Sequence, residues 1–271
     1  EAAVMNVVQL SPADLGIAAL LILALAGLSW RMQIGSERQL LISALRSTVQ
    51  LFLIGLVLKV LFDHAHPVWV ALLAAVMLTV AGREVMVRQQ RCFVGWWGFG
   101  VGTLSMFVSS FAVTVLALVV VIGTDPWYAP QYAIPLLGMI LGNTMNGISL
   151  GLDRLTQDAA QRRLVIEARL ALGQGWQRAI ADSRREAIRV GMIPIINAMS
   201  AAGIVSLPGM MTGQILAGTP PVEAVKYQIL VMFLIAGGTG FGTMVAVSFA
   251  ARRLFDERQR LRLDRLSSPG D

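Results

Sequence analysis

Long apolar runs separated by short polar stretches make up the pattern of hydrophobic and polar positions along this chain. A transmembrane helix requires about 20 mostly apolar residues, and such runs recur from one end of the sequence to the other. The expected spans are seven and lie at roughly 12–30, 40–62, 67–82, 97–122, 132–150, 188–207 and 225–251. The pattern therefore predicts an all-α integral membrane protein with about seven transmembrane helices in one domain over 1–271.

The polar connections differ in length, and the longest lies at 151–187. Within it Leu164, Ala168 and Leu172 recur at helical spacing, with arginine and glutamate at other positions. This spacing is typical of an amphipathic helix outside the membrane. The tail after Ala251 is rich in arginine, and we expect it to continue as an amphipathic helix that leaves the membrane.

The composition strengthens this picture, because 56% of the residues are hydrophobic and only 14% are charged. Soluble domains carry about 25% charged residues, so lipid is the expected surrounding of most of this chain. The net charge of +6 comes almost entirely from arginines that lie between the apolar runs. They form no single patch with interleaved aromatic residues, which excludes nucleic acid as a partner.

The basic residues also indicate the orientation of the spans, because cytoplasmic loops carry an excess of positive charge. Arginines gather in the first, third and fifth connections and in the tail, whereas the opposite side has only Lys59 and Lys226. We therefore predict an N-terminus outside the cell and a cytoplasmic C-terminus. The long helical connection 151–187 would then be a cytoplasmic loop.

A nucleotide site is excluded by the placement of lysine. A phosphate-binding loop needs the pattern G-x-x-x-x-G-K-[ST], and lysine occurs only at positions 59 and 226. We expect no cofactor in this chain, so ATP and magnesium would be bound by a partner subunit if ATP drives the protein. An intramembrane enzyme is also disfavoured, because no Asp, Glu or His lies deep in any expected span. Glu84 lies at the inner edge of the third span, where Arg83 could pair with it.

One cluster of possible metal ligands lies in an outer turn. His64 and His66 lie beside Asp63 and could hold a surface metal ion, although no fourth ligand is in view.

The cytoplasmic loop contains the segment EARLALG at 167–173. It resembles the Glu-Ala-Ala loop of ABC importer permeases, which forms a short helix that docks on a separate ATP-hydrolysing subunit. Ala168 and Gly173 are small enough for close helix approach, and Glu167 and Arg169 supply directional charged contacts. The alternative is an ordinary surface helix.

Polar side chains inside membrane spans are costly and are functional candidates by default. Arg46 and Gln50 lie one turn apart in the second span, Asn143 and Asn146 lie in the fifth, and Asn197 lies in the sixth. They could line a substrate path, or they could only join helices by hydrogen bonds. For Arg46, a structural ion pair or an extended side chain that reaches the headgroups is the alternative.

Proline and glycines break the apolar segment 206–214 at membrane depth. Irregular backbone is tolerated there only when it is buried in protein or lines a water-filled path. Met210, Met211 and Gln214 lie in this segment, and methionine thioethers suit soft metal ions. The segment is therefore a candidate substrate path with a metal-binding methionine pair. Methionines that merely fill gaps beside a kinked helix are the alternative.

Taken together, these residues resemble the FetB-like (YbbM-like) ABC transporter permeases, which are related to plant aluminium-tolerance permease subunits. The resemblance covers nearly the whole chain. It rests on the segments 45–51, 135–143, 167–173, 193–197, 206–218 and 226–228.

This resemblance implies properties that the residues alone do not give. It implies a homodimeric permease in the bacterial cytoplasmic membrane, paired with a cytoplasmic ATP-binding subunit. Bacterial members are associated with iron export and plant relatives with UDP-glucose transport, so iron is the leading cargo and an organic cargo the alternative. A passive channel is the remaining possibility.

Overall fold

The computed structural model describes residues 11–63 and 66–267, and most of these residues lie in helices. The long helices are α1 (Pro12–Arg31), α2 (Glu37–Asp63), α3 (Pro67–Val87), α6 (Pro130–Gln161), α9 (Ala181–Ala201) and α11 (Pro221–Arg253). Shorter ones are α4 (Trp96–Met106), η1 (Phe107–Phe111), α5 (Ala112–Leu116), η2 (Ala117–Ile122), α7 (Arg163–Ala171), α8 (Trp176–Ala179), α10 (Gly209–Leu216) and η3 (Leu263–Arg265). In these two described ranges extended backbone pairs only as isolated bridges, so the all-α prediction is confirmed.

Within residues 11–63 and 66–267, six helical segments are long and apolar enough to cross a membrane. They are Ala13–Arg31, Glu37–Asp63, Pro67–Val87, Trp97–Ile122, Pro130–Gln161 and Pro221–Arg253. The segment expected at 188–207 is not among them. Its helix, α9, begins seven residues earlier at Ala181, in an arginine-rich stretch that lowers the hydropathy, and ends at Ala201. Nevertheless α9 packs against α6 and α11 inside the bundle.

Local sequence signals set where the long helices begin. Proline occupies the first turn of α1, α3, α6 and α11, where the missing N–H is not needed by the helix. At α1 the Ser11 hydroxyl accepts from the Asp14 amide, and the Asp14 carboxylate accepts from the Ser11 amide at 2.8 Å. This reciprocal cap satisfies two amides at the helix start.

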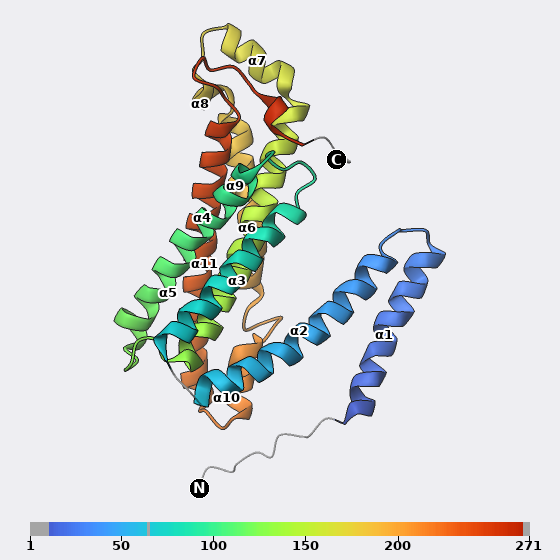
Figure 1. Cartoon of the computed structure of the whole chain (residues 1–271), viewed down its shortest axis with the longest axis vertical. Helices are drawn as coiled ribbons and strands as arrows, with labels where there is room; N and C mark the ends of the chain where they lie inside the picture. The colour runs from blue at the N-terminus through green and yellow to red at the C-terminus, as the bar shows by residue number, and fades with distance from the viewer. Residues whose placement is uncertain (1–10, 64–65, 268–271) are drawn as a thin grey trace.

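Helices α6, α9 and α11 meet so closely that parts of their backbones touch (Figure 1). A Cβ added at Gly191 of α9 would lie 2.5 Å from the carbonyl oxygen of Gly147 on α6. The same Cβ would lie 2.6 Å from Cγ2 of Thr243 on α11. Small residues of this kind let membrane helices approach and gain van der Waals contact, which replaces the hydrophobic drive that lipid does not supply.

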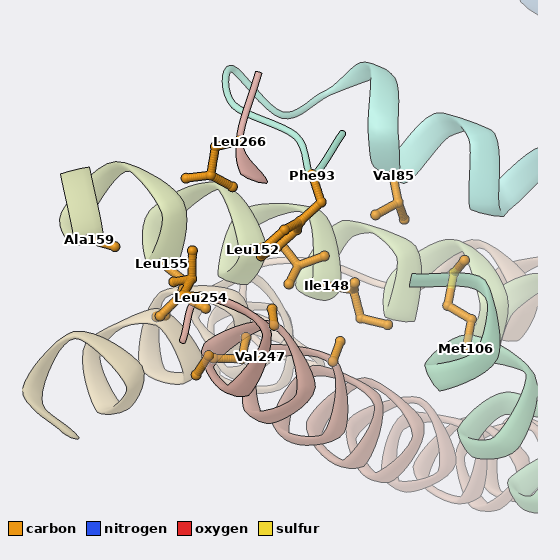
Figure 2. Close-up of a cluster of buried hydrophobic side chains, with 14 of the residues drawn as sticks. Val85, Phe93, Met106, Ile148, Leu152, Leu155, Ala159, Val247, Leu254 and Leu266 are labelled. Carbon is orange, nitrogen blue, oxygen red and sulfur yellow. The ribbon is translucent and has the colours of Figure 1, made fainter. Parts of the chain in front are cut away.

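A cluster of buried apolar side chains fills one end of the bundle, beside the α3–α4 loop (Figure 2). Leu152 and Leu155 of α6 and Leu254 at the end of α11 form its centre, and Phe93 from the α3–α4 loop covers it together with Leu266 of the tail. Segments that are far apart in the sequence are therefore joined here by burial of apolar surface.

The first two helices leave the bundle as an arm (Figure 1). Helices α1 and α2 form an antiparallel hairpin. In the most apolar window of α2 none of the residues is buried within the chain. Lipid or another protein surface must therefore cover most of this arm.

Two expected boundaries are corrected by the structure. Helix α6 continues to Gln161, so 151–161 belong to the long helix and not to a separate loop. The amphipathic helix predicted after Ala251 is wrong, because α11 ends at Arg253 and the tail folds back. The Val94 amide donates to the carbonyl of Arg265 at 2.9 Å, and burial of Leu266 completes the fold-back.

Candidate functional site

Helix α7 carries the predicted coupling segment at one end of the bundle, beyond α6 (Figure 1). Arg163 Nε donates to Glu167 Oε1 at 2.8 Å along the helix. Arg169 Nη2 forms an ion pair with Asp182 Oδ2 of α9 at 2.9 Å, and Arg169 Nη1 donates to the carbonyl of Ala179 at 3.3 Å. Hydrogen bonds from Arg185 and then from Arg169 lower the pKa of Asp182. The carboxylate is therefore charged at neutral pH, and Arg169 links α7 to the start of α9.

Gly173 has a different role from the close helix approach that its small size suggested. Its φ is +84°, and no atom lies within 4 Å of the Cβ that it lacks. The Gly173 amide donates to the carbonyl of Leu170, and the Gln174 amide donates to that of Arg169. This pair of bonds is a Schellman motif, which ends α7 and requires a residue with positive φ.

The apolar stripe predicted on this helix faces away from the chain. Leu164 is 80% exposed and Leu172 is 82% exposed, and Ala168 between them is exposed as well. The face that packs inward is instead that of the fully buried Ile166. An apolar stripe outside the bundle, beside charged side chains, is typical of a surface that another protein covers.

A groove of about 710 Å³ adjoins this stripe. It is lined by Glu167, Leu170, Gly173 and Gln174 of the α7 end and by residues 257–261 of the tail. Gln259 ties the two walls together, because its Oε1 accepts from the Trp176 amide at 3.0 Å. The tail is thus part of the same surface as the coupling segment.

A chain of polar side chains joins α2, α3 and α6. Arg46 Nη2 donates to Glu84 Oε1, so the structure favours the ion pair among the alternatives for Arg46. Arg88 Nε lies 3.8 Å from the other Glu84 oxygen, and Arg88 Nη1 donates to Asn146 Oδ1. The expected pairing of Glu84 with Arg83 is replaced by these contacts, and Arg83 is exposed.

The remaining polar candidates do not meet at one point. Asn143 Nδ2 donates to the carbonyl of Met139 in its own helix at 2.8 Å. Gln50 of α2 and Asn197 of α9 are exposed on the surface of the chain. Exposed amides at membrane depth need water or a second protein surface, because lipid offers them no hydrogen bonds.

The two adjacent methionines face different surroundings. Met210 packs against a buried apolar cluster to which α6, η2 and α11 contribute most of the side chains. Met211 instead lines a cavity of about 490 Å³ between the end of α9, α10 and α11. The Gln214 Oε1 atom is buried and lacks a hydrogen-bond donor. The structure therefore separates the predicted pair and keeps only Met211 at the cavity.

The histidine site in the outer turn finds no support among the described residues. His64 lies outside the described residues. His66 caps α3, because its Nδ1 accepts from the Val68 amide at 3.3 Å. Over 11–63 and 66–267 no group of three or more His, Cys, Asp or Glu side chains could hold a metal ion.

Residues that the sequence did not single out complete these arrangements. Arg88 follows the last turn of α3, one helical turn after Glu84, and Gln228 and Met232 are one turn apart on α11. Helical spacing of polar or sulfur-bearing residues was the available signal for both pairs. The buried Asp158 lies outside the expected spans, between Arg154 at 3.8 Å and Arg162 at 3.4 Å.

The helical bundle, its lipid-suited surfaces and its few polar side chains at membrane depth define an integral membrane protein. Residues 12–255 match the family described as uncharacterised protein family UPF0014, and the chain belongs to this family. A relative in Synechocystis, UPF0014 membrane protein slr1647, is 40% identical over 258 residues, covering 94% of this chain and 97% of the relative.

Two further relatives carry more descriptive names. The "Probable iron export permease protein FetB" of Escherichia coli is 31% identical over 263 residues, covering 95% of this chain and 97% of the relative. "Protein ALUMINUM SENSITIVE 3" of Arabidopsis thaliana is 29% identical over 252 residues, with 93% and 90% covered. These matches confirm the resemblance to FetB-like proteins and plant aluminium-tolerance proteins. No solved structure matches the chain.

Proposed function

We propose that this chain is the membrane subunit of an ABC transporter and that a separate cytoplasmic subunit binds and hydrolyses ATP. The observation that carries the proposal is the surface at the end of the bundle. There α7 presents the exposed stripe of Leu164, Ala168 and Leu172, and Arg169 ties α7 to α9. This surface suits a helix-in-groove contact with a partner. ATP and magnesium belong to that partner, because the chain has no phosphate-binding loop.

The orientation follows from the same surface. An ATP-binding subunit works in the cytoplasm, so α7 and the tail lie on the cytoplasmic side and the N-terminus lies outside. The arginine-rich connections then share the cytoplasmic side of a bacterial inner membrane, as the distribution of positive charge requires.

A second copy of the chain accounts for the exposed polar groups. Gln50 and Asn197 are exposed at membrane depth, and a homodimer would place them at a shared, partly hydrated surface between the subunits. ATP-driven closure of two partner subunits would move the two α7 helices and switch this surface between inward-facing and outward-facing states.

The cargo that we propose is iron or a related metal ion moved outward, as the name of the Escherichia coli relative suggests for that protein. An organic cargo such as UDP-glucose is the second candidate, since Arg46, Asn146 and Asn197 could bind polar groups. Stimulation of ATP hydrolysis by one cargo and not by the other, measured on the purified complex, decides between them.

The test of the docking surface is capture of the partner from native membranes in mild detergent, followed by mass spectrometry. Wild-type protein should bring down an ATP-binding subunit, and native masses should show two copies of each. The Leu164→Glu/Leu172→Glu variant should lose at least about tenfold of the partner, because charge replaces exposed apolar contacts near the middle of the surface.

The matched control is Gln177→Glu, an exposed position on the adjacent α8, which should keep the partner. Capture of no ATP-binding subunit by the wild type, in a preparation where other ABC complexes survive, would reject the transporter proposal. A passive channel would then be tested by conductance in lipid bilayers.

A further inference from the structure

Three methionines from three separate helices line one cavity near the start of α11. They are Met199 of α9, Met211 of α10 and Met232 of α11. Methionine makes up 13 of the 271 residues, whereas three of the 11 residues that line the cavity are methionine. Eleven residues drawn at random from this chain would include about half a methionine on average, so methionine is clearly enriched in the cavity lining.

A buried amide oxygen lies in the same cavity wall. Gln228 is only 8% exposed, and its Oε1 has no hydrogen-bond donor. Gln214 of α10 also has a buried Oε1 without a donor, but it does not line the cavity. Buried acceptors left without a partner cost free energy, so a group that attracts oxygen lone pairs, such as a cation, would be favoured here.

The chemistry of these donors selects the kind of cation. Thioether sulfur is a soft ligand that favours Cu(I), whereas oxygen and imidazole ligands suit harder divalent ions. No charged residue lines the cavity. Because the cost of removing an ion from water rises steeply with its charge, neutral ligands in an apolar cavity favour a monovalent ion over a divalent one.

We propose that Met199, Met211 and Met232, with the amide oxygen of Gln228, form a binding site for a soft monovalent cation, Cu(I) or Ag(I). As a cargo site it rests on the proposed transport function and specifies its substrate class, but the binding itself does not depend on a partner subunit. The site draws one sulfur from each of three helices, so it exists only when the end of α9, α10 and α11 are in contact.

The experiment is an anaerobic titration of Cu(I) into the full-length chain in lipid nanodiscs, in competition with a chromophoric Cu(I) chelator. Wild-type protein should bind one ion per chain, and X-ray absorption should show sulfur around the copper. The Met199→Leu/Met211→Leu/Met232→Leu variant conserves volume and should bind more than about 100-fold more weakly, since even outer-sphere ligand partners contribute 10–100-fold.

The matched control is Met77→Leu/Met139→Leu/Met145→Leu, three partly buried methionines that pack against the apolar clusters. This variant should bind Cu(I) as the wild type does. Gln228→Leu separates a ligand from a structural residue. Removal of an unpaired buried amide should leave the melting temperature unchanged or raise it, while Cu(I) affinity falls by about tenfold.

The proposed site is rejected if the wild type binds no Cu(I) or if the triple methionine variant binds Cu(I) as tightly as the wild type. It is also rejected if Fe(II) or Mn(II) competes equally with Cu(I), or if native mass spectra show only lipid bound to the chain. Partner capture is measured separately on the same protein. If the chain captures an ATP-binding subunit but binds no Cu(I), the proposed function stands and the Cu(I) site is rejected. If it binds Cu(I) but captures no ATP-binding subunit, the site stands and the transporter proposal is rejected.

Discussion

The α6–α9–α11 bundle and the α1–α2 arm belong to one chain, yet different surroundings hold them in place. In the bundle, Gly147 and Gly191 bring backbones into contact, and Thr243 fills the space beside them. In the arm, the glycines Gly16, Gly27 and Gly55 have no atom near the Cβ that they lack. Glycine in a membrane helix is therefore not a sign of close packing by itself. Its meaning depends on whether another helix lies over it.

The largest effect is expected when one methyl group is added to the bundle. Gly147→Ala would place a Cβ 2.7 Å from Cγ2 of Thr239 and 2.9 Å from the Gly191 carbonyl. We expect a loss of about 3 kcal/mol or more, because backbone atoms cannot give way as flexible side chains do. The loss of stability is measured by heating the protein in detergent and following the remaining folded protein by gel filtration with fluorescence detection.

The control for that variant lies on the same helix. No atom lies within 4 Å of the Cβ that Gly142 lacks, so Gly142→Ala should be neutral or gain up to about 1 kcal/mol. A similar loss at both positions would show that glycine matters here for helix flexibility and not for packing.

A smaller effect is expected from cutting the polar link between arm and bundle. Glu84→Gln removes the charge that Arg46 of α2 contacts, and intramembrane polar contacts are worth about 1 kcal/mol. Hydrogen exchange of α2 should rise by roughly fivefold, which corresponds to that free energy. A double-mutant cycle with Arg46→Gln isolates the pair, and a coupling energy near zero would contradict the link.

The smallest effect is expected in the arm itself. Leu21 of α1 is 73% exposed, so Leu21→Ala should change the unfolding free energy by less than about 0.5 kcal/mol. Leu155 of α6 is fully buried, and Leu155→Ala should cost about 2–5 kcal/mol. Equal losses in monomeric protein would remove the distinction between arm and bundle.

The sequence predicted the helical spans well because lipid imposes a length requirement that can be seen locally in any apolar run. It failed where distant residues decide the structure. The tail folds back because Leu266 packs with Phe93, and no local pattern after Ala251 shows that contact. Likewise α9 begins among arginines, since its first turns lie beside α7 and not in a purely apolar surrounding.

In the candidate site too, some features could be predicted from local sequence and others depend on distant residues. The segment 167–173 has a recognisable local pattern, and its position on an exposed helix agrees with the docking role that we propose. The partners of Arg46 and Met211 come from other helices, so residue type and spacing could not identify them. Met210 and Met211 are adjacent in the sequence, but successive residues of a helix point about 100° apart. This rotation is why only Met211 reaches the cavity.

The ion pair between Arg169 and Asp182 connects α7 to the start of α9, so a displacement of α7 can be transmitted along α9. Asp182 lies at one end of that helix and Met199 at the other, which at 1.5 Å per residue is a reach of about 25 Å. Pro194 lies in the helix between them and removes one backbone hydrogen bond, so α9 can bend more easily at this point. If the proposed partner displaces α7, the pull on Asp182 acts on a helix that is packed against α6 at Gly191. Bending at Pro194 would then let the last two turns of α9, with Met199, move while the packed part stays in place.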